Sequence, residues 1–157
     1  MNLLESTIKK ITPQDADVRA LARARLEQLT MPYWALGRLM DLAEDLAGIM
    51  GSIKPSVGRK TVVTMAGDHG ITAAGVSKYP QEVTVQMIYN FIHGGAGINA
   101  LARLVGARVV VVDMGVAGDL SGLVKMGKII SKRTGPGTKN MVTGPAMSRE
   151  EAVRALE

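Results

Sequence analysis

The stretch Thr61-Val-Val-Thr-Met65, followed directly by Ala66-Gly-Asp-His-Gly-Ile-Thr-Ala-Ala-Gly-Val-Ser-Lys-Tyr79, decides the fold class of this chain. The first five residues form a short apolar run of the kind that makes a buried strand. The next fourteen form a polar, glycine-rich loop with an acid, an imidazole, hydroxyls and a phenol. Open α/β sheets place ligands where such loops leave the carboxyl ends of buried strands. The sequence therefore predicts a ligand site in this loop.

A second apolar run, Arg108-Val-Val-Val-Val-Asp113, contains four consecutive valines without polar alternation. This pattern is typical of a strand buried on both faces, and hence of a parallel sheet covered by helices. Between the two runs, apolar residues at helical spacing predict helices over 80–93 and 96–105. The order strand, helix pair, strand indicates a β-α-β crossover. We therefore expect an α/β fold with a parallel, Rossmann-like, three-layer sheet.

Two amphipathic helices are predicted before the first strand, over 15–29 and 36–50, with Thr12 as a candidate N-cap of the first. They indicate a helical N-terminal segment at 1–58, followed by the α/β part at 59–157. A short third strand is expected at 128–131, and Ser148-Arg-Glu-Glu151 is a capping box that opens a further helix. Because two firm strands are too few for a complete doubly wound sheet, the α/β domain is expected to be truncated.

Composition narrows the class of protein. The chain has 157 residues, 46% of them hydrophobic and only 3% aromatic, and it has no cysteine and a net charge of +5. The hydrophobic content indicates a globular domain, and the absence of cysteine excludes disulfides and thiolate metal sites. Scattered basic residues with few aromatics to stack on bases argue against nucleic-acid binding. Without an apolar segment of about 20 residues or a secretion-type N-terminus, a soluble cytoplasmic protein with no membrane contact is expected.

The pair Asp68-His69 admits three interpretations: part of a substrate site, a metal site, or residues that pin the loop by hydrogen bonds. The metal interpretation is the weakest, since His93 is too isolated to complete a ligand set. Two glycine-rich stretches also remain open. Gly94-Gly-Ala-Gly-Ile-Asn99 and Gly135-Pro-Gly-Thr-Lys-Asn140 suit either an anion or a tight turn. Neither has the spacing of a nucleotide fingerprint.

Motifs of one enzyme family run along nearly the whole chain. They are Leu36-Gly-Arg-Leu39, Ala66-Gly-Asp-His-Gly70, Gly75-Val-Ser77, Tyr79-Pro-Gln-Glu-Val-Thr84, Asn90-Phe91, Gly94-Gly-Ala-Gly-Ile-Asn99, Val111-Val-Asp113 with Gly115-Val116, Gly137-Thr138 with Asn140, and Gly144-Pro-Ala-Met-Ser148. In these motifs and their order the chain resembles the N-terminal half of the nicotinate-nucleotide–dimethylbenzimidazole phosphoribosyltransferases of cobalamin synthesis.

The resemblance implies transfer of ribose 5-phosphate from nicotinate mononucleotide to 5,6-dimethylbenzimidazole, giving α-ribazole 5′-phosphate and nicotinate, without a metal or a cofactor. It implies that the catalytic glutamate base and a glycine-rich phosphate loop lie beyond residue 157, so no catalytic residue is assigned here. The base pocket is expected around Tyr79, Pro80, Gln86 and Met87, and some family members carry serine and glutamine in place of Tyr79 and Met87. The full set of expected substrate-binding residues is Asp68, His69, Ser77, Tyr79, Pro80, Gln86 and Met87.

The resemblance also implies a homodimer. Because family members are about twice this length, the 157 residues alone are expected to be inactive. The alternative hypothesis is a catalytically inactive fragment that acts as a ligand-binding or dimerising α/β module.

Overall fold

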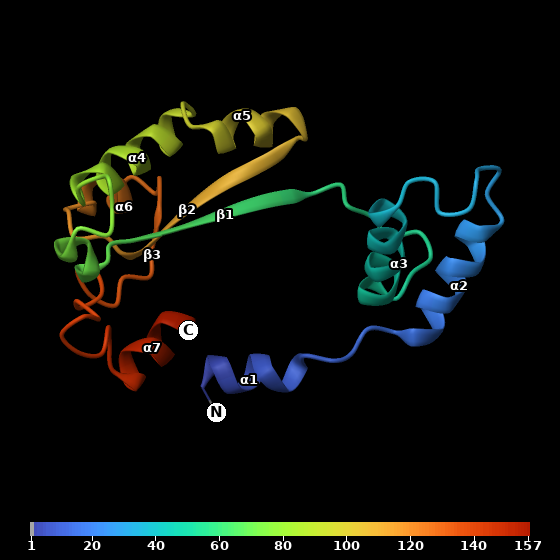
Figure 1. Cartoon of the computed structure of the whole chain (residues 1–157), viewed down its shortest axis with the longest axis horizontal. Helices are drawn as coiled ribbons and strands as arrows, with labels where there is room; N and C mark the ends of the chain where they lie inside the picture. Colours follow the sequence, from blue (N-terminus) through green and yellow to red (C-terminus); the bar gives the residue numbers. More distant parts are fainter. Residues whose placement is uncertain (1) are drawn as a thin grey trace. The chain divides into compact units, whose positions relative to one another are not determined.

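The computed structural model describes residues 2–157 and divides them into two compact units, one ending at Gly58 and one running from Arg59 to Glu157 (Figure 1). The first unit is helical, with α1 (Leu3–Lys10), α2 (Ala16–Glu27) and α3 (Arg38–Met50). The second contains the sheet and the helices α4 to α7. No helix among residues 2–157 is both long enough and apolar enough to cross a membrane.

Helix α2 begins one turn later than Thr12 would place it, because Asp15 is its N-cap. The Asp15 carboxylate accepts a hydrogen bond from the Val18 amide at 3.0 Å. The side chain of an N-cap reaches the amide donors of the second and third helical residues, and Val18 is the third. The expectation of Thr12 as the cap was therefore wrong. Helix α1 was not predicted, and none of its residues is buried.

Three parallel strands form the sheet of the second unit, in the order β1-β2-β3. They are β1 (Lys60–Gly67), β2 (Ala107–Gly115) and the two-residue β3 (Ile130–Ser131). In the long β1–β2 pair, Val62 lies beside Val109 and Thr64 beside Val111. This confirms the parallel α/β sheet that the two apolar runs predict.

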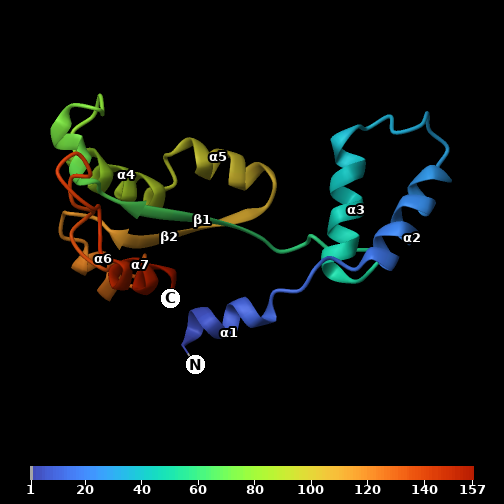
Figure 2. The same ribbon diagram turned by 60° about the horizontal axis from the view of Figure 1, so that its bottom comes forward.

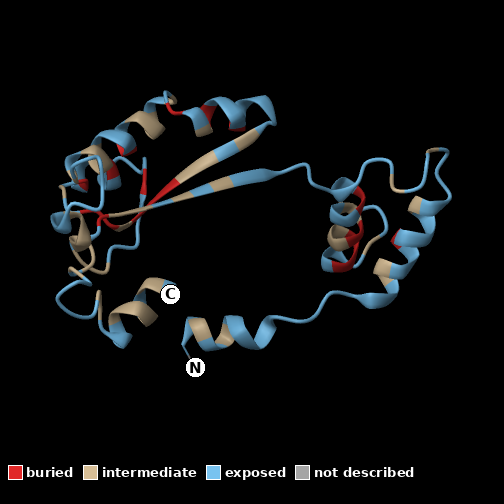
Figure 3. Ribbon diagram, viewed as in Figure 1, coloured by how far each residue is buried: buried red, intermediate tan, exposed pale blue. Residues whose placement is uncertain are grey.

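Helices α4 (Glu82–His93) and α5 (Gly97–Leu104) connect β1 to β2 and lie along one side of these strands (Figure 2). The remaining helices of the unit are the short α6 (Ser121–Lys125) and α7 (Arg149–Leu156), and a 3-10 turn spans Gly70–Ala74. The buried core residues of this unit are aliphatic: Ile88, Val111, Val116, Leu120, Leu123 and Ile129. Figure 3 colours buried segments of α4 and β2 red.

Burial is uneven across the two strands. Val111 and Val112 of β2 are buried, whereas Val63 and Met65 of β1 are 50% and 69% exposed. Successive side chains of a strand point to opposite faces, so the β1 residues that face α4 and α5 are covered and Val63 and Met65 are not. The first strand was predicted to be buried, but no residue of β1 is buried: its inner face is half-buried and its other face is exposed.

Candidate functional site

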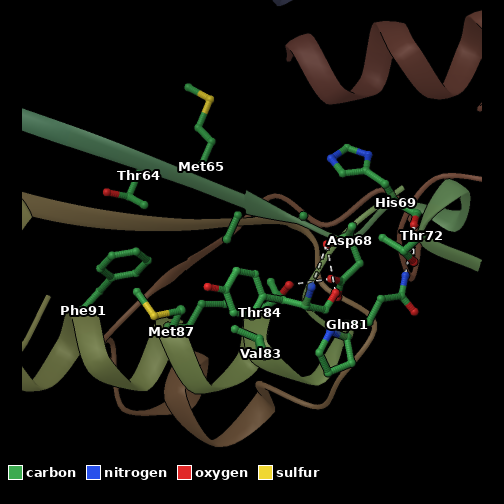
Figure 4. A pocket seen from close by; sticks show the side chains of 16 residues that line it. Thr64, Met65, Asp68, His69, Thr72, Gln81, Val83, Thr84, Met87 and Phe91 are labelled. Atoms are coloured by element: carbon green, nitrogen blue, oxygen red, sulfur yellow. Dashed lines mark hydrogen bonds between the residues drawn. The ribbon is translucent and has the colours of Figure 1, made fainter. Parts of the chain in front are cut away.

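A cavity of about 370 Å³ opens where β1 ends, between the strand, the following loop and helix α4 (Figure 4). We call it the base cavity. Met87, Ile88 and Phe91 of α4 form an apolar wall, and the loop contributes hydroxyl, imidazole and amide groups. Cavities of this size with an apolar lining and a few polar groups are typical of small-molecule sites. The lining residues are Thr64, Met65, Ala66, Gly67, Asp68, His69, Thr72, Ser77, Tyr79, Pro80, Gln81, Val83, Thr84, Met87, Ile88 and Phe91.

Six of the seven expected substrate-binding residues come together around the base cavity: Asp68, His69, Ser77, Tyr79, Pro80 and Met87. The seventh, Gln86, lines a different cavity of about 450 Å³ together with Glu82, Val85 and Ala117. Adjacent residues of an α-helix point about 100° apart, so Gln86 and Met87 face different sides of the first turns of α4.

Five further lining residues carry polar or aromatic groups that the sequence analysis did not assign to the site: Thr64, Thr72, Gln81, Thr84 and Phe91. A signal for two of them was present in the sequence. Thr84 lies three residues before Met87, and Phe91 lies four residues after it, which is the spacing of one helix face. Thr72 and Gln81 had no comparable signal, because the loop between β1 and α4 has no regular period.

Asp68 is the most enclosed polar residue of the site, at 4% exposure. One of its carboxylate oxygens accepts a hydrogen bond from the Thr84 hydroxyl at 2.7 Å, and the other accepts one from the Ala117 amide at 2.7 Å. Figure 4 shows the carboxylate turned toward Thr84 and α4. These bonds show that Asp68 pins the loop. A part in substrate binding is compatible with them, because Asp68 also lines the cavity.

The imidazole of His69 points away from the Asp68 carboxylate, so the two side chains do not form a dyad (Figure 4). Its Nδ1 lies 3.4 Å from the Thr138 hydroxyl, and residues 69 and 138 form an isolated parallel bridge. The His69 carbonyl accepts hydrogen bonds from the Thr72 hydroxyl and from the side-chain Nε2 of Gln81. The backbone of His69 is thus fixed, and its ring stays exposed.

A second cavity, of about 400 Å³, lies beside the base cavity and shares Gly67, Asp68 and His69 with it. We call it the glycine-rich cavity, because the stretch Thr134–Lys139 forms much of its lining. Met147, Glu151 and Ala155, at and inside α7, close another side. Gly137 has φ +99°, and a Cβ there would lie 2.8 Å from the Asp68 carbonyl oxygen. Only glycine permits this approach without strain.

The other glycine-rich stretch forms a tight turn between α4 and α5. Gly94 ends α4 in the left-handed conformation, and the side chain of Asn99 accepts a hydrogen bond from the Ala96 amide. The amide group of Asn99 also donates to the Phe91 carbonyl at 3.0 Å. Because Asn99 is buried and occupies the amino end of α5, the turn interpretation of this stretch is favoured over an anion site.

Three other acidic side chains of the unit, those of Asp113, Asp119 and Glu150, have hydrogen-bond partners. Asp113 is 2% exposed, and one of its oxygens accepts hydrogen bonds from the Gly115 and Val116 amides. A hydrogen bond from the Ser121 backbone amide holds the pKa of Asp119 below its usual value. A hydrogen bond from the backbone amide of Glu150 lowers the pKa of the Glu150 carboxyl in the same way. Neither Asp119 nor Glu150 lines the two cavities. Within residues 2–157, no three His, Asp or Glu side chains come together as metal ligands.

A parallel sheet with cavities at the carboxyl ends of its strands is typical of α/β domains that bind small molecules. Residues 11–157 match a family model described as phosphoribosyltransferase, and the chain belongs to this family. It is 61% identical to the nicotinate-nucleotide–dimethylbenzimidazole phosphoribosyltransferase of Syntrophotalea carbinolica and 60% identical to that of Desulfotalea psychrophila. Both alignments cover all of this chain and 44% of the relative.

A solved structure has the same fold. The crystal structure of the nicotinate-nucleotide–dimethylbenzimidazole phosphoribosyltransferase from Thermus thermophilus superimposes on this chain with a TM-score of 0.80, at 48% sequence identity. The superposition covers 90% of this chain and 42% of that one. The chain therefore spans less than half the length of the relatives that it matches.

Proposed function

We propose that the protein to which these residues belong transfers ribose 5-phosphate from nicotinate mononucleotide to 5,6-dimethylbenzimidazole, in the synthesis of the lower ligand of cobalamin. The observation that carries the proposal is the pair of neighbouring cavities with Gly67, Asp68 and His69 in common. In a group transfer, the enzyme has to hold the donor and the acceptor next to each other, with their reacting atoms close together. The choice of substrates is supported by two relatives, 61% and 60% identical, that are named nicotinate-nucleotide–dimethylbenzimidazole phosphoribosyltransferases.

The chemistry sets the demands on the site. A ring nitrogen of the benzimidazole attacks the anomeric carbon, the bond from that carbon to the pyridinium nitrogen breaks, and nicotinate leaves with the electron pair. Attack opposite the leaving group inverts the anomeric carbon. The pyridinium is already cationic, so its departure needs no proton. The site has to supply an apolar slot for the rings, anchors for the ribose phosphate, and a base for the benzimidazole N–H.

The base cavity meets the first of these demands. Met87, Ile88 and Phe91 provide an apolar wall of the kind that a flat aromatic ring contacts. The hydroxyl of Tyr79 lines the same cavity, where it can hydrogen-bond to a ring nitrogen. We place dimethylbenzimidazole there and the nucleotide on the side of His69 and the glycine-rich cavity.

Asp68, Asp113 and Glu82, the acids nearest the base cavity, are not placed to act as its catalytic base, and this favours a base contributed from outside the described residues. Both oxygens of Asp68 already accept short hydrogen bonds. Asp113 is bound to two backbone amides. Glu82 lines the cavity on the other side of α4. Because none of these acids offers a free carboxylate to the base cavity, we propose that the 157 residues alone do not turn over.

The test compares three samples in an assay for α-ribazole 5′-phosphate: the 157-residue chain, a chimera that joins it to the remaining part of the Syntrophotalea carbinolica relative, and that relative itself. We expect product from the chimera and the relative, and none from the chain. Removing a general base alone costs a factor of about 10²–10⁴ in rate.

Turnover by the 157-residue chain would place the base within it and make Glu82, Asp68 and Asp113 the first residues to replace. A folded chimera without activity, beside an active relative, would instead favour the alternative function, a ligand-binding or dimerising module.

A further inference from the structure

We propose that Asp68 is a positioning residue: its carboxylate joins helix α4 to the segment after β2 and thereby holds the wall of the base cavity in its binding geometry. The inference rests on the proposed function only for the identity of the ligand. It assigns to Asp68 neither the role of base nor that of a metal ligand.

Hydrogen bonds from Asp68 reach three separate segments of the unit. Its side chain binds Thr84 in the first turn of α4 and Ala117 in the loop after β2. Its backbone amide donates to the Gly115 carbonyl at the end of β2 at 3.0 Å, and its carbonyl accepts from the Thr138 amide at 3.0 Å. These segments are far apart in sequence, and Asp68 is hydrogen-bonded to all three of them.

Thr84 is the partner that links Asp68 to the ligand site. It is the third residue of α4 and lines the base cavity, as do Met87 and Phe91 one and two turns further along the helix. The hydroxyl of Thr84 is bound to Asp68, and therefore the first turn of α4 stays at a fixed distance from the end of β1. A shift of this turn would move the apolar wall relative to the loop, and small misplacements of a site cost much of its function.

Both donors to the Asp68 carboxylate are uncharged, and this makes the role testable. An asparagine at this position can accept from the Ala117 amide with its oxygen and donate to the Thr84 hydroxyl oxygen with its nitrogen. Asp68→Asn therefore keeps both connections and removes the charge. Asp68→Ala removes both connections and leaves the Ala117 amide without its partner, which is costly in a buried place.

The first experiment measures binding of 5,6-dimethylbenzimidazole to the 157-residue chain by titration calorimetry, at a temperature where circular dichroism shows each variant folded. We expect Asp68→Ala and Thr84→Val to raise Kd about tenfold, the effect of losing one buried hydrogen bond. Asp68→Asn and Thr84→Ser, which keep the hydrogen bonds, stay within about threefold of the parent. A purely structural role would lower the melting temperature of the first pair without this change in Kd.

The second experiment needs no ligand. We expect hydrogen exchange of the Ala117 amide to be slow in the parent and in Asp68→Asn. In Asp68→Ala it should become about tenfold faster or more, because the amide loses its acceptor. Thr84→Val serves as the matched control, because it leaves the bond from Ala117 to Asp68 in place.

The outcomes separate the two proposals. Failure of the parent to bind dimethylbenzimidazole contradicts the proposed function, and the exchange of Ala117 then decides whether Asp68 holds the loop. Binding by the parent that Asp68→Ala and Thr84→Val leave unchanged overturns the positioning role, and the proposed function stands. A loss of affinity for dimethylbenzimidazole in Asp68→Asn as large as that in Asp68→Ala also overturns the positioning role. The charge of Asp68 would then act on the ligand directly.

Discussion

Met87 sits on the apolar wall of the base cavity and is 36% exposed, so a ligand can cover it. We expect Met87→Ala to weaken binding of dimethylbenzimidazole about fivefold, because loss of about 40 Å² of apolar contact at about 25 cal/mol per Å² accounts for such a change. Titration of the parent and of Met87→Ala with dimethylbenzimidazole measures the change in Kd.

Gln86→Ala is the matched control for this prediction, because Gln86 is on the same helix and lines the cavity on its other side. It should leave the affinity unchanged. Equal losses in Gln86→Ala and Met87→Ala would contradict the assignment of the base to the cavity at the end of β1.

At the scale of elements, one buried acid connects α2 to α3. Glu44 of α3 is 6% exposed and forms ion pairs with Arg19 at 3.0 Å and Arg23 at 2.7 Å, both on α2. The contact with Arg19 is also a hydrogen bond, whereas the one with Arg23 lacks hydrogen-bond geometry. Arg23 in turn lies over the ring of Trp34, 4.7 Å from its centroid.

We therefore expect Glu44→Ala to lower the free energy of unfolding of the helical unit by about 2 kcal/mol. This is below the full cost of breaking a buried pair, about 3–5 kcal/mol, because the two arginines are 39% and 45% exposed. Trp34 is the only tryptophan of the chain and belongs to this unit, so its fluorescence in a urea titration reports the change. Glu27→Gln on the exposed part of α2 should shift the midpoint little. An unchanged midpoint in Glu44→Ala would show that apolar packing alone joins the helices.

At the scale of the whole molecule, the helical unit leaves large apolar side chains uncovered. Leu21 of α2 and Leu39 and Ile49 of α3 are 61%, 64% and 65% exposed. Contiguous exposed apolar surface is typical of an interaction surface, and the broad apolar stripes of α2 and α3 are the candidates for it in this unit. We expect self-association of the chain into a homodimer or a larger species.

Sedimentation equilibrium at tens of micromolar tests this prediction. Leu39→Glu should weaken association, since a charge in an apolar interface is costly. Lys54→Glu changes the charge at an exposed position of the same unit and should not. A parent chain that is monomeric at this concentration would refute the homodimer.

Much of the fold was predictable from the sequence because it depends on local patterns. The two valine-rich runs were identified as strands, and both are strands in the structure. The helices over 80–93 and 96–105 were placed within about two residues of α4 and α5. Apolar periodicity and glycine stops act within one element, so they are legible without knowledge of its neighbours. Thr12 failed as a cap because several polar residues compete at that helix start, and the backbone geometry decides between them.

The sequence by itself determined the class of fold and the family, and it predicted the loop that lines the base cavity. Only the tertiary structure decided which side chains share a cavity. It separated Gln86 from Met87, joined Asp68 to Thr84 and Ala117, and brought Thr138 next to His69. These pairs lie 16 to 69 residues apart in sequence, apart from the neighbours Gln86 and Met87. Their meeting depends on strand register and helix rotation, which packing of the whole unit sets and no local pattern encodes.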